Sequence, residues 1–164
     1  MDYLDKEILV LGCGNILFGD DGFGPEVINY LQKNYIIPDD IFVFNAGLSV
    51  RTILFNIVLS DIKPKKIIIV DAVNIGKTAG TIFPLDVNDM PEIKCDDFSM
   101  HQIPTSNLLK ELKNFCNVDV KIIVVQVQNI PEEVSPGLSN VVKDSIPVAC
   151  ELILKEINQN FANF

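Results

Sequence analysis

Apolar runs of strand length alternate along the chain with stretches that carry apolar residues at helical spacing. The runs that predict strands are residues 7–13, 41–45, 66–71, 80–85 and 120–127. The stretches that predict helices are residues 24–34, 50–60, 104–116 and 137–157. This order is typical of an α/β fold, a three-layer sandwich with helices on both faces of a twisted, mixed but mostly parallel sheet of about five strands. No internal repeat or linker interrupts the pattern, so we expect one domain over residues 1–164.

Two nearly continuous β-branched runs, at 65–70 and 120–125, predict central strands that are covered on both faces. Only the short segment 74–80 separates the third predicted strand from the fourth. A helical crossover does not fit in that length, so we expect the strand at 80–85 to run antiparallel. Pro147 interrupts the last helical pattern and predicts a kink or a break there.

A glycine-rich stretch, residues 12–25, follows the first apolar run and leads into the first predicted helix. Such junctions often bind phosphate through backbone N–H groups, but Asp20 and Asp21 would repel an anion here. The dinucleotide fingerprint also fails, because Leu17 stands where it needs a glycine and the second strand ends at Asn45 rather than at an acid. This loop therefore favours a cation or a proton-transfer role.

The composition of the chain argues against several classes of binding partner and against secretion. The formal net charge of −9 argues against nucleic acid and anionic membranes, and no apolar stretch approaches the roughly 20 residues that cross a bilayer. The acidic start, residues 1–7, does not resemble a secretory signal. The four cysteines are scattered without a C-x-x-C pair, which indicates free thiols rather than disulfides or a zinc site. They are Cys13, Cys95, Cys116 and Cys150. We therefore expect a cytoplasmic protein.

Candidate chemical groups follow the predicted strands. Asp20 and Asp21 follow the first strand, and Asp71 closes the third. Residues 86–99 show no apolar periodicity, which is typical of a long loop, and His101, the single histidine, stands at the end of this loop. Each has an ordinary structural explanation, as a turn, cap or surface residue. Together they would meet at one edge of an open α/β sheet, where they could ligate a metal such as nickel, zinc or iron, or form an acid–base set.

These residues also carry a resemblance to a known family, the hydrogenase maturation endopeptidases, which process the large subunit of [NiFe]-hydrogenases. The matching stretches follow one another in the family's order over nearly the whole chain. They are Gly12-x-Gly14-Asn15-x-Leu17-x-x-Asp20-Asp21-Gly22-x-Gly24, Val70-Asp71-Ala72, His101, and Gln126-Val127-Gln128-x5-Val134-x-Pro136-Gly137-Leu138-Ser139-x2-Val142. The variant Asp-Asp-Gly-Phe-Gly-Pro most resembles the branch that serves the deazaflavin-reducing hydrogenases of methanogens.

The resemblance implies a peptidase of aspartic or metal-assisted type that removes the C-terminal extension of the nickel-loaded large-subunit precursor. It implies that Asp21, Asp71 and His101 are the catalytic residues and bind the nickel that the substrate carries. Asp20 would then lie behind these ligands. The family often has glutamate where Asp21 stands, so its side chain reaches one methylene less far. Because nickel arrives with the substrate, we expect no tightly bound cofactor in the free enzyme.

Two other classes of function are compatible with the residues. A maturation chaperone that checks for nickel would use the same three residues without cutting the chain. A small nucleotide-binding regulator would need phosphate contacts that the acidic loop does not favour.

Overall fold

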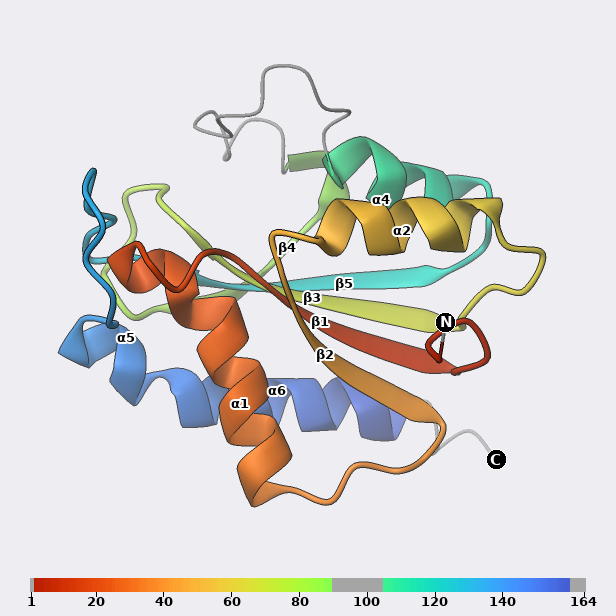
Figure 1. The fold of residues 1–164 in the computed structure, drawn as a ribbon, viewed down its shortest axis with the longest axis horizontal. Helices are drawn as coiled ribbons and strands as arrows, with labels where there is room; N and C mark the ends of the chain where they lie inside the picture. Colours follow the sequence, from red (N-terminus) through yellow and green to blue (C-terminus); the bar gives the residue numbers. More distant parts are fainter. Residues whose placement is uncertain (1, 90–104, 160–164) are drawn as a thin grey trace.

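The computed structural model describes residues 2–89 and 105–159, which form a five-stranded sheet with helices on both faces (Figure 1). The strands are β1 (Ile8–Cys13), β2 (Ile41–Gly47), β3 (Lys66–Val73), β4 (Ile82–Leu85) and β5 (Asp119–Gln126). The α-helices are α1 (Phe23–Asn34), α2 (Val50–Leu59), α4 (Thr105–Asn114), α5 (Asn140–Asp144) and α6 (Ile146–Gln159). Two short 3₁₀ helices are η1 (Gly19–Gly22) and η2 (Val87–Asp89).

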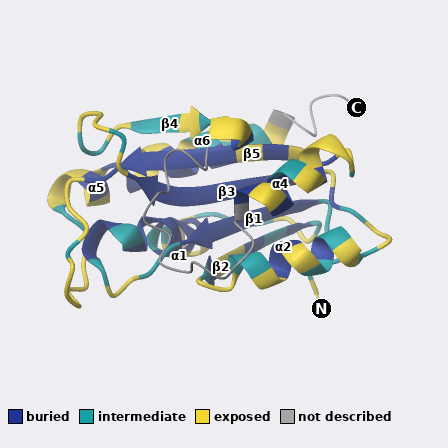
Figure 2. Cartoon of the chain, turned by 90° about the horizontal axis from the view of Figure 1, so that it is seen from above, coloured by how far each residue is buried: buried dark blue, intermediate teal, exposed yellow. Residues whose placement is uncertain are grey.

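The strand order is β2-β1-β3-β5-β4. The pairs β1–β2, β1–β3 and β3–β5 are parallel, and β4 pairs with β5 in the antiparallel sense. Both the predicted fold class and the predicted antiparallel strand are thus confirmed. Strand β3 is buried along its whole length, as its β-branched run predicted, and so is β1 (Figure 2). Strand β5 fits the same prediction only from Ile122 onward, because Asp119 and Lys121 at its start are exposed.

Two apolar layers enclose the sheet. Helices α1 and α6 pack together on one face, and α2 and α4 pack together on the other (Figure 1). Alternate residues of β3 supply the two layers, with Ile68 and Val70 facing α1 and α6, and Ile67 and Ile69 facing α2 and α4. Each face of the sheet therefore has its own core, and the parallel strands end at a common edge between the two layers.

The expected interruption near Pro147 is a break. Helix α5 ends at Asp144 and α6 begins at Ile146, so Pro147 occupies the first turn of α6. The missing N–H of proline costs little there, because the first N–H groups of a helix have no partner within the helix. No helix in the described parts of the chain is long and apolar enough to span a membrane.

Candidate functional site

The connections that leave β1 and β3 diverge at the carboxyl edge of the sheet. From β1 the chain crosses to β2 on one side of the sheet, whereas from β3 it continues to β4 and β5 on the other side. Ligand sites of open α/β sheets form at such a point, outside the carboxyl ends of the two strands. The short helix η1, which follows β1, contacts β3 at this point.

Glycines allow η1 and α1 to approach the strands closely. A Cβ atom on Gly24 would stand 2.5 Å from the backbone oxygen of Val70 and would also overlap the backbone of Cys13. A Cβ atom on Gly12 would stand 2.5 Å from the backbone oxygen of Gly24. The start of α1 therefore rests directly on the ends of β1 and β3, which only glycine permits. This contact places η1 and its two aspartates beside the end of β3.

Asp21 lies in η1 and is half-buried. Its Oδ2 atom accepts a hydrogen bond from the backbone N–H of Asn15 at 2.9 Å. The chain turns so tightly here that a side chain on Gly14, whose φ is +129°, would overlap the carbonyl oxygen of Asp21. One carboxylate oxygen is thus held by the loop, while the partial exposure of the side chain leaves it accessible from outside.

Asp20 has a different environment, although it is the adjacent residue. Its side chain is fully buried and accepts hydrogen bonds from the loop that follows β5. The donors are the N–H groups of Gln128 (2.8 Å), Asn129 (3.1 Å) and Ser139 (2.7 Å) and the Ser139 hydroxyl (3.0 Å). Asp20 therefore ties η1 to this loop.

Asp71 is the sixth residue of β3, three positions before the loop that follows the strand. It is 2 % exposed, and its Oδ1 atom accepts a hydrogen bond from the N–H of Ala72 at 2.8 Å. By strand alternation it shares a face with Ile69 and Val73, which belong to the layer of α2 and α4. A buried carboxylate on a central strand is costly, so its presence at this edge is itself a functional signal.

The structure thus brings the loop of Asp21 against the strand of Asp71. The third predicted residue, His101, lies outside the described residues, and so does the segment 90–104 that carries it. Within the described residues, no three His, Cys, Asp or Glu side chains group in a way that could hold a metal ion. Helix α4, which follows His101 in the sequence, packs on the face of the sheet on which Asp71 lies. The three-residue site consequently stays a prediction.

The loop between β5 and α5 is a third component of this edge. Phe18 forms a parallel bridge with Ser135, and the Gly19 N–H donates to the Ser135 carbonyl at 2.9 Å. Gln126, at the end of β5, is 3 % exposed, and its side-chain oxygen accepts hydrogen bonds from the N–H groups of Ile75 (2.9 Å) and Lys77 (3.2 Å). The positioning roles of Ser139 and Gln126 were not predicted, although a glutamine that ends an apolar run is a signal for such a role.

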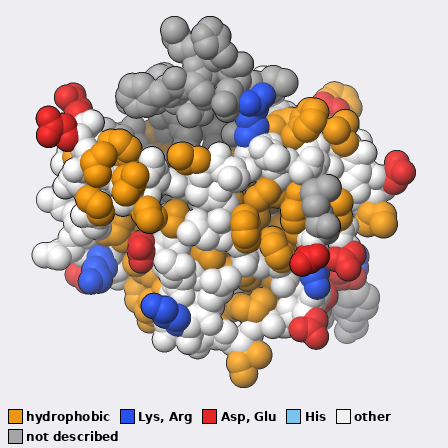
Figure 3. Space-filling view, viewed as in Figure 1, with side chains coloured by type: hydrophobic (Ala, Val, Ile, Leu, Met, Phe, Trp, Pro, Cys, Tyr) orange, Lys and Arg blue, Asp and Glu red, His pale blue; other side chains and the backbone are white. Residues whose placement is uncertain are grey.

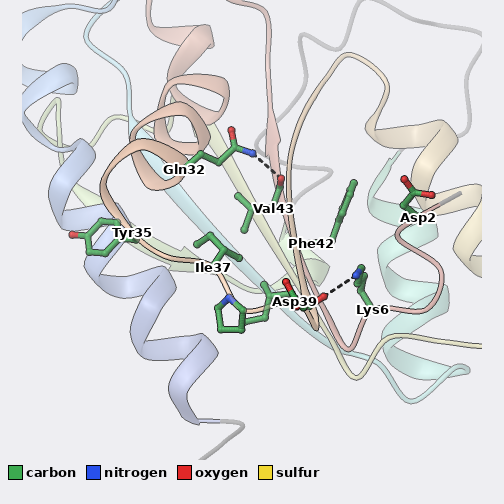
Figure 4. A pocket seen from close by; sticks show the side chains of 10 residues that line it. Asp2, Lys6, Gln32, Tyr35, Ile37, Asp39, Phe42 and Val43 are labelled. Carbon is green, nitrogen blue, oxygen red and sulfur yellow. Dashed lines mark hydrogen bonds between the residues drawn. The ribbon is translucent and has the colours of Figure 1, made fainter.

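A separate open pocket lies at the amino end of the sheet, beside the start of β2 (Figure 4). Lys6 and Asp39 line it, and the Lys6 ammonium donates to the Asp39 carbonyl at 2.7 Å. Parallel α/β sheets bind ligands at the opposite end, so this pocket does not compete with the carboxyl edge as the candidate site.

Fold and site together define a class of protein: an open α/β domain with carboxylates, rather than a phosphate loop, at its switch point. Comparison with known proteins gives the family, since residues 25–156 match the hydrogenase maturation protease family. The chain belongs to this family.

Individual relatives agree. A Methanocaldococcus jannaschii protein assigned to the hydrogenase maturation proteases is 42 % identical over 155 residues, which cover 94 % of this chain and 98 % of that one. The coenzyme F420 hydrogenase subunit delta of Methanothermobacter thermautotrophicus is 40 % identical, over 93 % and 96 % of the two chains. Among solved structures, the hydrogenase maturating endopeptidase HybD of Escherichia coli superposes with a TM-score of 0.71 at 29 % identity, over 94 % of this chain and 93 % of that one.

Proposed function

We propose that this protein removes the C-terminal extension of the large-subunit precursor of a [NiFe]-hydrogenase after nickel has been inserted. Membership of the maturation protease family carries the proposal. The carboxyl edge supports it, because η1 presents Asp21 beside the end of the strand that carries Asp71. A protein that bound a nucleotide would instead present backbone N–H groups and no carboxylate there.

Asp21, Asp71 and His101 are the residues that we propose as ligands to the nickel of the precursor. Two carboxylates and one imidazole suit a borderline metal, and three ligands leave positions for the groups that the precursor supplies. A metal so held can polarise the scissile carbonyl or activate a water molecule. Asp21 suits an approaching metal because its side chain is partly exposed. Its Oδ2 atom already accepts a hydrogen bond from the Asn15 N–H, which holds the carboxylate in place.

The hydrogenase that it serves is, in this proposal, of the coenzyme F420-reducing type. The relative from Methanothermobacter thermautotrophicus bears the name of a subunit of that hydrogenase and matches this chain almost end to end. The Asp20-Asp21-Gly22-Phe23-Gly24-Pro25 stretch supports the same choice, because it resembles the corresponding stretch of that branch of the family.

The test is incubation of the purified protein with nickel-loaded and with nickel-free precursor, followed by mass spectrometry of the large subunit. We expect loss of the C-terminal segment only from the nickel-loaded precursor, and no stoichiometric metal in the free enzyme. Binding without any mass change would identify a nickel-checking chaperone instead. Equal cleavage of both precursors, or dependence on a metal that the free enzyme retains, would indicate an ordinary metallopeptidase.

A further inference from the structure

Strand β2 forms one edge of the described sheet, so its outward-facing backbone groups lack a neighbouring strand. The outward residues can be identified from the hydrogen bonds. The Val43 carbonyl accepts from the Gln32 side chain at 3.0 Å, which places Val43 among the outward residues (Figure 4). Alternation along a strand then makes Asn45 the next outward residue.

In the part of the chain that the structure describes, this edge is covered at one end and uncovered at the other. At the amino end, Gln32 covers the Val43 carbonyl, and the Ile41 N–H donates to the Pro38 carbonyl at 3.1 Å. At the carboxyl end, Phe44 and Asn45 are exposed, and the described residues show no comparable cover over Asn45. Proteins usually protect an edge strand, because free N–H and C=O groups attract other chains. Among residues 2–89 and 105–159, the uncovered part of this edge lies beside the candidate site, which suggests use of those groups.

Apolar side chains accompany the open end. Phe44 is 38 % exposed and stacks on Phe42, while Leu48, just past the strand, is 76 % exposed. The Gly14 N–H donates to the Gly47 carbonyl at 3.2 Å, which brings Leu48 next to the loop that leads to Asp21. Figure 3 shows apolar side chains gathered over that loop, over β2 and over α2. The open backbone and the apolar side chains thus continue directly into the candidate site.

We propose that the end of β2, with Phe44, Asn45 and Leu48, is the docking surface for an extended, apolar segment of the precursor chain. The segment adds as a short strand to the edge at Asn45, and its side chains pack on Phe44 and Leu48. From there the chain passes the loop of Gly14 and reaches Asp21. The inference rests on the proposed function for the identity of the precursor.

Two substitutions test the two parts of the surface. Asn45→Pro removes the outward N–H, which β1 does not use, whereas the control Asn45→Ala keeps that N–H. Leu48→Ser removes the exposed apolar side chain. Its control is Ile36→Ser, because Ile36 is 99 % exposed but precedes β2 at the amino end of the sheet. Thermal unfolding of each variant checks that the fold is retained.

The measurements are the dissociation constant of the nickel-loaded precursor by calorimetry, together with KM and kcat for cleavage. We expect Asn45→Pro and Leu48→Ser to raise the dissociation constant and KM about tenfold with kcat nearly unchanged, and Ile36→Ser to match the wild type. Asn45→Ala keeps the backbone N–H, so it should weaken binding less than Asn45→Pro does. If cleavage and binding of these folded variants equal those of the wild type, the docking surface is wrong and the proposed function stands.

Other outcomes separate the two proposals. Binding that the variants weaken, without cleavage by the wild type, would refute the peptidase activity and support the surface. A wild-type dimer that Asn45→Pro converts to monomer would overturn the inference, because it would assign this edge to a second copy of the chain.

Discussion

The carboxylate of Asp20 binds both the backbone N–H and the hydroxyl of Ser139, 119 positions further along the chain, at 2.7 and 3.0 Å. With the N–H groups of Gln128 and Asn129, these donors surround a fully buried carboxylate. Hydrogen bonds to an ionised group are about twice as strong as neutral ones. Asp20 therefore holds the loops after β1 and β5 together.

Asp20→Asn is expected to lower the free energy of unfolding by about 3 kcal/mol. An amide nitrogen in place of one oxygen faces N–H donors, so at least one buried hydrogen bond to a charged group is lost. Asp21→Asn changes a half-buried side chain with one such bond, and its cost should stay near 1 kcal/mol. Urea unfolding of both variants measures the difference. Equal costs would show that Asp20 does not anchor the loop.

Asp21→Asn, Asp71→Asn and His101→Ala should each reduce precursor cleavage by about a hundredfold or more, if these residues bind the nickel of the substrate. The two amide substitutions keep the side-chain volume, so the fold should be retained. Asp20→Asn should reduce cleavage less than Asp21→Asn. Full cleavage by folded Asp71→Asn would remove Asp71 from the site, and equal losses at positions 20 and 21 would mean that their roles are divided wrongly.

Ile68→Asp, in contrast to the substitutions at the candidate site, should unfold the protein. Ile68 is fully buried in β3, and an unpaired carboxylate there has no donor comparable to those around Asp20. We expect this variant to be unfolded at room temperature, as judged by circular dichroism. A folded Ile68→Asp protein would contradict the burial of β3 on both faces.

The parts of the fold that depend on local pattern could be predicted. The β-branched run at 65–70 indicated a buried strand, and the short segment 74–80 indicated that the strand after it runs antiparallel, because both properties are visible in adjacent residues. That this strand pairs with β5 rather than with β3 is a property of the assembled sheet. The opposite environments of Asp20 and Asp21 could not be derived from the residues alone. They depend on the turn of η1 and on donors from residues 128–139, more than a hundred positions away. The contact of Gly24 with Val70 is likewise a property of the assembled sheet.

Gly14 and Gly137 form a matched pair for testing the tight loop. Both have a positive φ, +129° and +108°, so alanine is strained at either position. A Cβ atom on Gly137 meets nothing within 4 Å, whereas one on Gly14 overlaps the carbonyl oxygen of Asp21. Gly137→Ala should therefore cost about 1 kcal/mol and leave cleavage intact. Gly14→Ala should cost more and abolish cleavage, and similar behaviour of the two variants would show that the loop can relax without consequence.

Because the thiol of Cys150 is buried, the free energy of unfolding should fall as the pH rises through the alkaline range. Cys150 lies in α6 with no exposed surface, and burial raises the pKa of its thiol from 9.0 to about 11. Between these two values the unfolded chain releases the thiol proton while the folded chain keeps it. The folded state therefore loses stability as the pH rises from about 9 to about 11. The stability that the protonated Cys150 thiol contributes is fully present below pH 9.

The variant Cys150→Ala isolates this effect, because every other group titrates in both proteins. The difference in unfolding free energy between wild type and variant should be constant up to about pH 8 and then shift against the wild type by about 2 kcal/mol near pH 11. Urea unfolding at several pH values measures it, with Cys116→Ala, at a partly exposed thiol, as the control. A difference that stays constant to pH 11 would mean that the Cys150 thiol ionises as readily in the folded protein as in the unfolded chain.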